Sequence, residues 1–277
     1  MKALVIAAAL LAVSCGGSET TVGGTDPEVV PDTAAATPPE PELPDPRLDD
    51  ALRAIAAGDF EGASALAERV AAERPSSARA AFVTALALHK QKNYGAAIPR
   101  FDRALELGPT FEPFAPVHYF RGWCLYNLGR LAEARAAFET HLALVPDDGD
   151  SRFALGLIAS DEGRLADARE GLTAALRDAE ARIARGQNDR RADAAKARAR
   201  LADLELMRDD VPRVEALAAA RAQLEAALET YPPHYTTWYK LHQVLTEQGE
   251  DELAAIALRN HDDWKARVRP GSEGLGQ

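Results

Sequence analysis

The sequence predicts an all-α protein built as a superhelical solenoid of about six helix pairs. Ala supplies about a fifth of the 277 residues and aromatic residues only 6%, a composition that favours helices over sheets. Two Cys residues exclude a scaffold held together by disulfides. A turn pattern also returns at a fixed spacing, since Pro75 and Pro109 are 34 residues apart, as are Gly129 and Gly163. A period of this length is typical of stacked two-helix repeats.

Residues 1–14 have the pattern of a signal peptide. Lys2 supplies one positive charge, and the apolar stretch Ala3–Val13 follows it, as in the charged and hydrophobic regions of secretory signals. As a helix, the stretch would reach about 17 Å, which is too short for a bilayer core of about 30 Å. We therefore expect export and not a membrane-spanning helix.

The end of this stretch, Ala12-Val13-Ser14-Cys15, resembles the lipobox of bacterial lipoproteins. The resemblance implies that Cys15 is lipidated and becomes the mature N-terminus, which anchors the chain in the cell envelope. Gly16 after the Cys is compatible with the periplasmic face of the outer membrane. However, Ala12 stands where lipoboxes usually carry Leu, and an ordinary signal peptidase would also accept Ala12 and Ser14. Plain secretion without a lipid therefore remains the alternative.

Residues 15–46 are predicted to be a disordered tether that follows the lipidated Cys. Between residues 16 and 46 there are seven Pro, seven acidic residues and no Lys or Arg. Such a segment buries too little apolar surface to offset the entropy of ordering it. It accounts for most of the net charge of -11. The alternative is a Pro-rich ligand for a groove-type domain, but Pro38-Pro39-Glu40-Pro41 lacks a flanking basic residue.

From residue 47 onwards the chain repeats one turn followed by an Ala-rich helical run. Aligning the turns puts a small residue at one position of each second helix: Ala63, Ala97, Ala134, Ala168, Ala220 and Ala254. Four residues later comes a larger apolar position, occupied in order by Ala67, Phe101, Phe138, Leu172, Leu224 and Leu258. The small residue lets two helices approach closely, and the larger one fills the seam to the next pair.

This pattern resembles the tetratricopeptide repeat (TPR), a pair of antiparallel helices that stacks into a superhelix. In first helices, Gly122 and Gly156 fit the close-packing position of the repeat. The resemblance implies a TPR solenoid over residues 47–266 and a flexible tail at 267–277. Residues 176–211 depart from the pattern, which predicts an elongated or irregular helix pair there. Their many Arg residues indicate a solvated helix face or, alternatively, a surface for an anionic partner.

In TPR proteins the first helices line a groove that binds partners. The resemblance implies that eight residues of this chain occupy groove-facing positions of the repeat. These are Phe82, His89, Tyr119, Trp123, Tyr126, Asn127, Phe153 and Tyr239. Tyr119, Trp123 and Tyr126 follow one helical stripe, and Tyr and Trp are enriched in binding hot spots. Aromatic residues at helical spacing also build cores, so both interpretations stay open here.

The sequence contains no catalytic motif, and we expect no catalytic residues, no cofactor and no metal site. Cys124 and His118 would point about 120° apart on one helix, and no third ligand accompanies His234 and His242 with metal-site spacing. The acidic balance argues against nucleic acid as a partner. We therefore expect a non-enzymatic scaffold that binds a peptide or protein and contacts a membrane through its lipid. The alternative is a secreted carrier or sensor that holds a small molecule or glycan in the aromatic groove.

Overall fold

The computed structural model describes residues 41–268. The chain divides into two parts, residues 1–38 and residues 39–277, and only the second part is described below. The predicted signal peptide, Cys15, and residues 16–40 of the predicted tether and 269–277 of the predicted tail lie outside the described residues. The predictions for those segments therefore stay predictions.

The end of the predicted tether is described and packs on the helices, since Glu42 accepts hydrogen bonds from Ser77 and from the backbone N–H of Arg79, and Pro46 begins α1. The first two residues of the predicted tail belong to α12.

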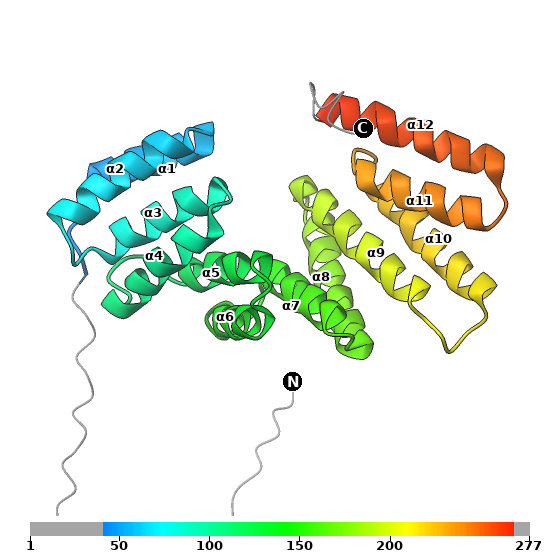
Figure 1. Ribbon diagram of the computed structural model, residues 1–277, viewed down its shortest axis with the longest axis horizontal. Coiled ribbons are helices and arrows are strands. Elements are labelled where there is room, and N and C mark those ends of the chain that lie inside the picture. The colour runs from blue at the N-terminus through cyan, green and yellow to red at the C-terminus, as the bar shows by residue number, and fades with distance from the viewer. Residues whose placement is uncertain (1–40, 269–277) are drawn as a thin grey trace, which may run out of the picture. The chain divides into compact units, whose positions relative to one another are not determined.

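Residues 41–268 fold into α-helices, one short 3₁₀ helix and no strand (Figure 1). The helices are α1 (Pro46–Ala57), α2 (Phe60–Glu73), α3 (Ala78–Lys90), α4 (Tyr94–Leu107), α5 (Pro116–Asn127), α6 (Leu131–Leu144), α7 (Gly149–Asp161), α8 (Leu165–Ala184), η1 (Asn188–Arg190), α9 (Arg191–Leu206), α10 (Arg213–Thr230), α11 (Tyr235–Glu247) and α12 (Asp251–Val268). The predicted fold class, an all-α solenoid of about six helix pairs, is confirmed.

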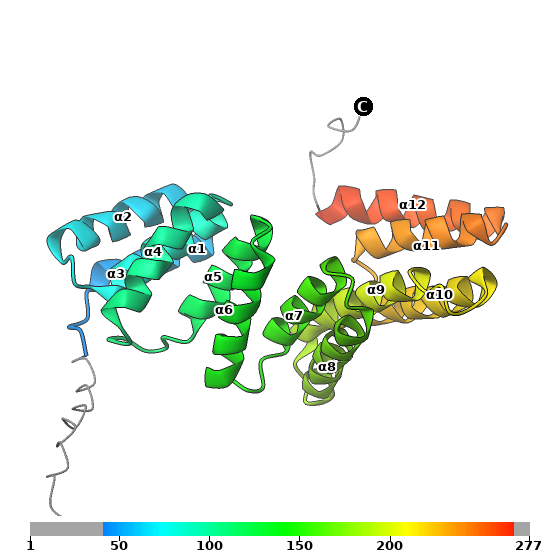
Figure 2. The ribbon, with the colours of Figure 1, turned by 60° about the horizontal axis from the view of Figure 1, so that its bottom comes forward.

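Each odd-numbered helix packs against the even-numbered helix that follows it, from α1 with α2 to α11 with α12. We call the odd-numbered helices the first helices of the pairs and the even-numbered ones the second helices. First helices of neighbouring pairs also contact one another, from α1 with α3 through α7 with α9 (Figures 1 and 2). Side chains of α5, α7 and α9 are thereby brought together although they lie far apart in the sequence.

The turns within the pairs explain the repeated glycines. Gly58, Gly129, Gly163 and Gly249 have φ between 72° and 84°, a left-handed conformation that glycine adopts without steric cost. At the same place in the second pair stands Lys92 with φ of 62°, the one non-glycine residue with positive φ in the described part of the chain. The α9–α10 turn differs, since it leads through Asp209 and Asp210 to Pro212 before α10.

The seams between helices follow the predicted register. All six small residues at the first register position, from Ala63 to Ala254, are buried. Phe101, Phe138, Leu172 and Leu224 at the second position have no exposed surface. A Cβ added to Gly122 would lie 2.9 Å from the ring of Phe138. The glycine therefore allows the third pair to close around a large aromatic side chain, as the register predicts.

Several helices in the C-terminal half are longer than those before them. Helix α8 has 20 residues and α10 has 18, whereas α2, α4 and α6 have 14 each. A helix of 14 residues from Leu165 would end at Asp178, so the additional residues of α8 carry Arg182 beyond the end of a standard repeat helix. Among residues 41–268, none of the helices combines the length and the apolar character that a membrane crossing requires.

Candidate functional site

A cavity of about 410 Å³ lies among helices α5, α7, α8 and α9. Three predicted groove residues, Tyr119, Trp123 and Phe153, supply its aromatic lining. The charged residues that line it are Asp148, Asp150, Asp178, Asp193, Arg182, Arg190 and Lys196. The cavity thus combines apolar ring surface with a dense set of charges, which is more polar than the lining of most small-molecule sites.

Core side chains hold the aromatic lining in place. The ring of Phe138, which is fully buried, lies 6.0 Å from Tyr119 and 5.4 Å from Trp123 in edge-on geometry, an arrangement that aromatic pairs prefer. The His141 ring packs against Tyr119 at 5.4 Å. Burial raises the pKa of Tyr119 to about 12, so its hydroxyl stays protonated. The aromatic residues of the lining are therefore uncharged, and side chains of α6 pack against them.

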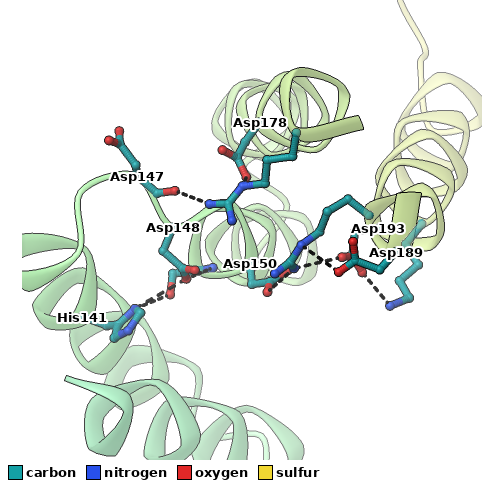
Figure 3. Close-up of polar contacts among 11 residues, drawn as sticks. His141, Asp147, Asp148, Asp150, Asp178, Asp189 and Asp193 are labelled. Carbon is teal, nitrogen blue, oxygen red and sulfur yellow. Dashed lines mark hydrogen bonds and ion pairs between the residues drawn. The ribbon is translucent and has the colours of Figure 1, made fainter. Parts of the chain in front are cut away.

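Most charges of the cavity are paired with one another (Figure 3). Arg182 Nε lies 2.8 Å from an Asp178 oxygen, and Lys196 Nζ lies 3.0 Å from Asp193. Arg190 reaches two carboxylates at longer distances, 3.3 Å to Asp193 and 3.5 Å to Asp150. The three cations are therefore engaged by carboxylates of the same cavity.

Asp148 and Asp150 flank the start of α7 and play different roles. Asp148 caps the helix, because its carboxylate accepts a hydrogen bond of 2.8 Å from the backbone N–H of Ser151. Asp150 has Arg190 as its cationic partner, and in Figure 3 it lies between Asp148 and Asp193. Desolvation, with the nearby charges of Asp193 and Asp148, raises the pKa of Asp150. Four carboxylates face three cations here, so the cavity lining carries one excess negative charge.

A second cavity, of about 290 Å³, also borders helix α5. Tyr126 lines it together with Leu157, Leu172 and Met207. The Tyr126 hydroxyl donates a hydrogen bond of 2.8 Å to Asp161. Tyr119, Trp123 and Tyr126, which we call the α5 stripe, therefore border two cavities between the first helices.

The other predicted groove residues lie elsewhere. Phe82 is only 8% exposed and packs 5.5 Å from Phe111, so it contributes to the core. His89 is half-buried, with its ring 5.4 Å from that of Phe120. Asn127 is exposed and donates to the backbone oxygen of Trp123. Tyr239 lies in the last pair, 44% exposed, and packs against His261 at 5.3 Å.

The carboxylates of the cavity are not among the groove residues that the sequence predicts. Asp148 and Asp150 stand at the start of α7, but Asp178 lies in α8 and Asp193 in α9, and no spacing rule connects the three helices. One signal was present, because Asp147-Asp148-Gly149-Asp150 concentrates three carboxylates at the start of a groove-lining helix. A helix N-terminus favours such charges without any ligand, so the signal does not by itself indicate a site.

The structure also brings Cys124 next to His89, with the sulfur 3.4 Å from Nδ1. Burial raises the pKa of Cys124 to about 12 and, with the nearby charge of Lys90, lowers the pKa of His89 to about 4. Both groups are neutral near pH 7, whereas a nucleophilic Cys needs its thiolate form. Within residues 41–268, no group of three or more His, Cys, Asp or Glu side chains is arranged to hold a metal ion.

The Arg-rich stretch of residues 176–211 is largely neutralised by neighbouring carboxylates. Besides the cavity pairs, Arg198 pairs with Glu180 and Arg200 with Asp203. A surface for an anionic partner needs cations that are not already engaged in this way. The observed pairing favours a solvated, ion-paired helix face.

Comparison with known proteins supports the repeat assignment. Two family models, both described as tetratricopeptide repeat, match residues 48–110 and 88–156. No curated protein sequence matches the chain.

Several solved structures share the fold. PilW, a type IV pilus biogenesis factor, aligns with a TM-score of 0.60 and 19% identity over 82% of this chain and 94% of its own. PilF of Pseudomonas aeruginosa aligns with a TM-score of 0.55 and 19% identity over 82% and 92%. A chain of the APC/C hetero-tetramer Cut9–Hcn1 aligns with a TM-score of 0.60 and 15% identity over 82% of this chain, which spans 40% of that protein's length. At these identities the likeness concerns the fold, and together with the family models it shows that this chain contains tetratricopeptide repeats within a TPR-like solenoid.

Proposed function

We propose that this protein is a non-catalytic scaffold that binds a peptide or protein segment along the first helices α5, α7 and α9. The observation that carries the proposal is the α5 stripe, whose three aromatic residues border two cavities in succession. Tyr and Trp provide large contact areas with polar tips and dominate many binding interfaces. Two neighbouring cavities along one helix suit an extended segment, which places successive side chains in successive pockets.

Replacement of two residues of the α5 stripe should weaken peptide binding strongly without unfolding the protein. Short peptides would be selected from a random displayed library against the purified full chain, and their affinities would be measured by fluorescence anisotropy. Each hot-spot aromatic contributes about 2 kcal/mol or more, so Trp123→Ala with Tyr126→Ala should weaken binding by about 100-fold or more. Both side chains keep some exposure, so the helical circular dichroism should persist.

The matched control is the pair Trp264→Ala and Tyr231→Ala, which removes the same residue types from outside both cavities. This control should leave the affinity unchanged. Equal loss of affinity in both double variants, or failure to select any peptide, would contradict the proposed binding site. Loss of helicity in the Trp123 and Tyr126 variant would instead assign these residues to the core.

We further propose that the scaffold is a lipoprotein anchored through Cys15 at the periplasmic face of the outer membrane. The support is the sequence Ala12-Val13-Ser14-Cys15 after an apolar stretch, with a Pro-rich acidic segment as spacer. Several acyl chains, each stabilised by about 0.8 kcal/mol per buried CH₂, anchor a protein firmly. Cells grown with a labelled fatty acid should label the wild type and leave Cys15→Ser unlabelled. An unlabelled wild type would instead support secretion without an anchor.

A further inference from the structure

We infer that the cavity among α5, α7, α8 and α9 is a subsite for a basic side chain, Lys or Arg, of the bound segment. This inference rests on the proposed function and names the chemistry of one of its two cavities. It is carried by the charges of the lining together with the aromatic surface beside them.

The aromatic surface fits the apolar part of such a side chain. Lys and Arg bury their methylene stems against apolar groups while the charged head finds polar partners. Trp123, Tyr119 and Phe153 lie on the same cavity as the carboxylates, and Trp is the ring that binds cations best. Among residues 41–268, the cation–π contacts involve Lys90 and Arg267. The cations of the cavity therefore make no cation–π contact with Trp123, and a basic side chain of a ligand could make one.

The carboxylates fit the charged head. Asp178 and Asp193 have cations within 3.0 Å, whereas Asp150 has only the 3.5 Å contact with Arg190. Asp148 has no Lys or Arg partner, but its carboxylate caps α7 through the backbone N–H of Ser151. Among the carboxylates that pair with a cavity cation, Asp150 therefore has the longest and weakest contact, in a lining with one excess negative charge. An ammonium or guanidinium group placed beside Asp150 would neutralise that excess and form charge-assisted hydrogen bonds.

An acidic ligand fits the cavity less well. Each cavity cation already has a carboxylate partner, and an incoming anion would have to displace one of them. It would also bring a fifth negative charge close to Asp148, Asp150 and Asp193, and like charges in proximity are unfavourable. The charge arrangement therefore discriminates between ligands of opposite sign.

The experiment compares Asp150→Asn with the wild type, using the full chain and the peptides selected as above. The selected sequences should be enriched in Lys or Arg next to an apolar residue. Replacement of that basic residue by Gln, or Asp150→Asn in the protein, should weaken binding by about tenfold, as expected for loss of a charged hydrogen bond. Combining both changes should cost little more than either alone, because they remove the same contact.

Glu170→Gln serves as the control for net charge, because this exposed residue of α8 lies outside the cavity lining. Its affinity should equal that of the wild type. Enrichment of acidic peptides, or basic peptides that bind Asp150→Asn as tightly as the wild type, would overturn the subsite. If the affinity of those peptides still decreased in the Trp123 and Tyr126 variant, the proposed function would be supported and the subsite for a basic side chain would be contradicted. If the library yielded no binders, both would fall.

Discussion

Phe138→Ala is expected to lower the free energy of unfolding by about 3–5 kcal/mol, the range for removal of a buried Phe ring. Phe138 is fully buried and fills the seam of the third pair, where Gly122 closes over its ring. It also supports the cavity lining, since Tyr119 and Trp123 pack edge-on against it. The surrounding helices are held by neighbouring pairs on both sides, so we expect the space left by the ring to close only partly.

Urea unfolding followed by circular dichroism measures this change. Phe138→Leu keeps most of the buried volume and should cost less than about 1.5 kcal/mol, the usual limit for volume-conserving replacements. A loss below about 1 kcal/mol for Phe138→Ala would show that the seam is loosely packed. It would also remove the physical basis for a preformed aromatic lining.

Gly156→Ala should destabilise the protein by about 2–3 kcal/mol, the upper part of the range for overpacking a close helix contact. An added Cβ would lie 2.9 Å from Leu172 Cγ and 3.0 Å from the Leu172 backbone nitrogen. Gly171 faces the same crossing, with its own Cβ position 3.1 Å from the α-carbon of Gly156. Helices α7 and α8 therefore approach too closely for a methyl group, and backbone atoms have to move.

Gly95→Ala is the matched control, because a Cβ at Gly95 in α4 would meet nothing within 4 Å. Because Gly95 is the second residue of α4, helix propensity should stabilise this variant by less than about 1 kcal/mol, the value that applies in a helix interior. The same urea titration compares the two variants. If Gly156→Ala also raised the free energy of unfolding, the conclusion that α7 and α8 approach too closely for a methyl group would be contradicted.

The repeat register could be predicted because each pair solves the same packing problem with the same residue sizes. A small residue such as Ala134 and a larger one such as Phe138 recur in second helices, and both are buried as expected. The glycine positions were predictable for the same reason. Gly122 and Gly156 mark places where first and second helices of a pair meet without room for a side chain.

The candidate site could be predicted only in part. The position of a residue in the repeat does not determine which side chains from other segments pack against it. Phe82 and Tyr119 occupy the same place in successive repeats, yet Phe111 from the α4–α5 connection packs against Phe82. Tyr119 instead borders the cavity. Arg182 reaches the cavity only because α8 continues beyond the usual repeat length. Interactions that depend on loop length and helix length have no periodic signature in a single sequence.

We propose that a peptide segment binds on the first helices beside the α5 stripe. Amide hydrogen exchange of the full chain, with and without a selected peptide, tests it most directly, because bound segments protect the backbone that they contact. We expect protection concentrated in α5, α7 and α9. Protection confined to the second helices α2, α4 and α6, or no change when the protein is saturated with peptide, would contradict the claim.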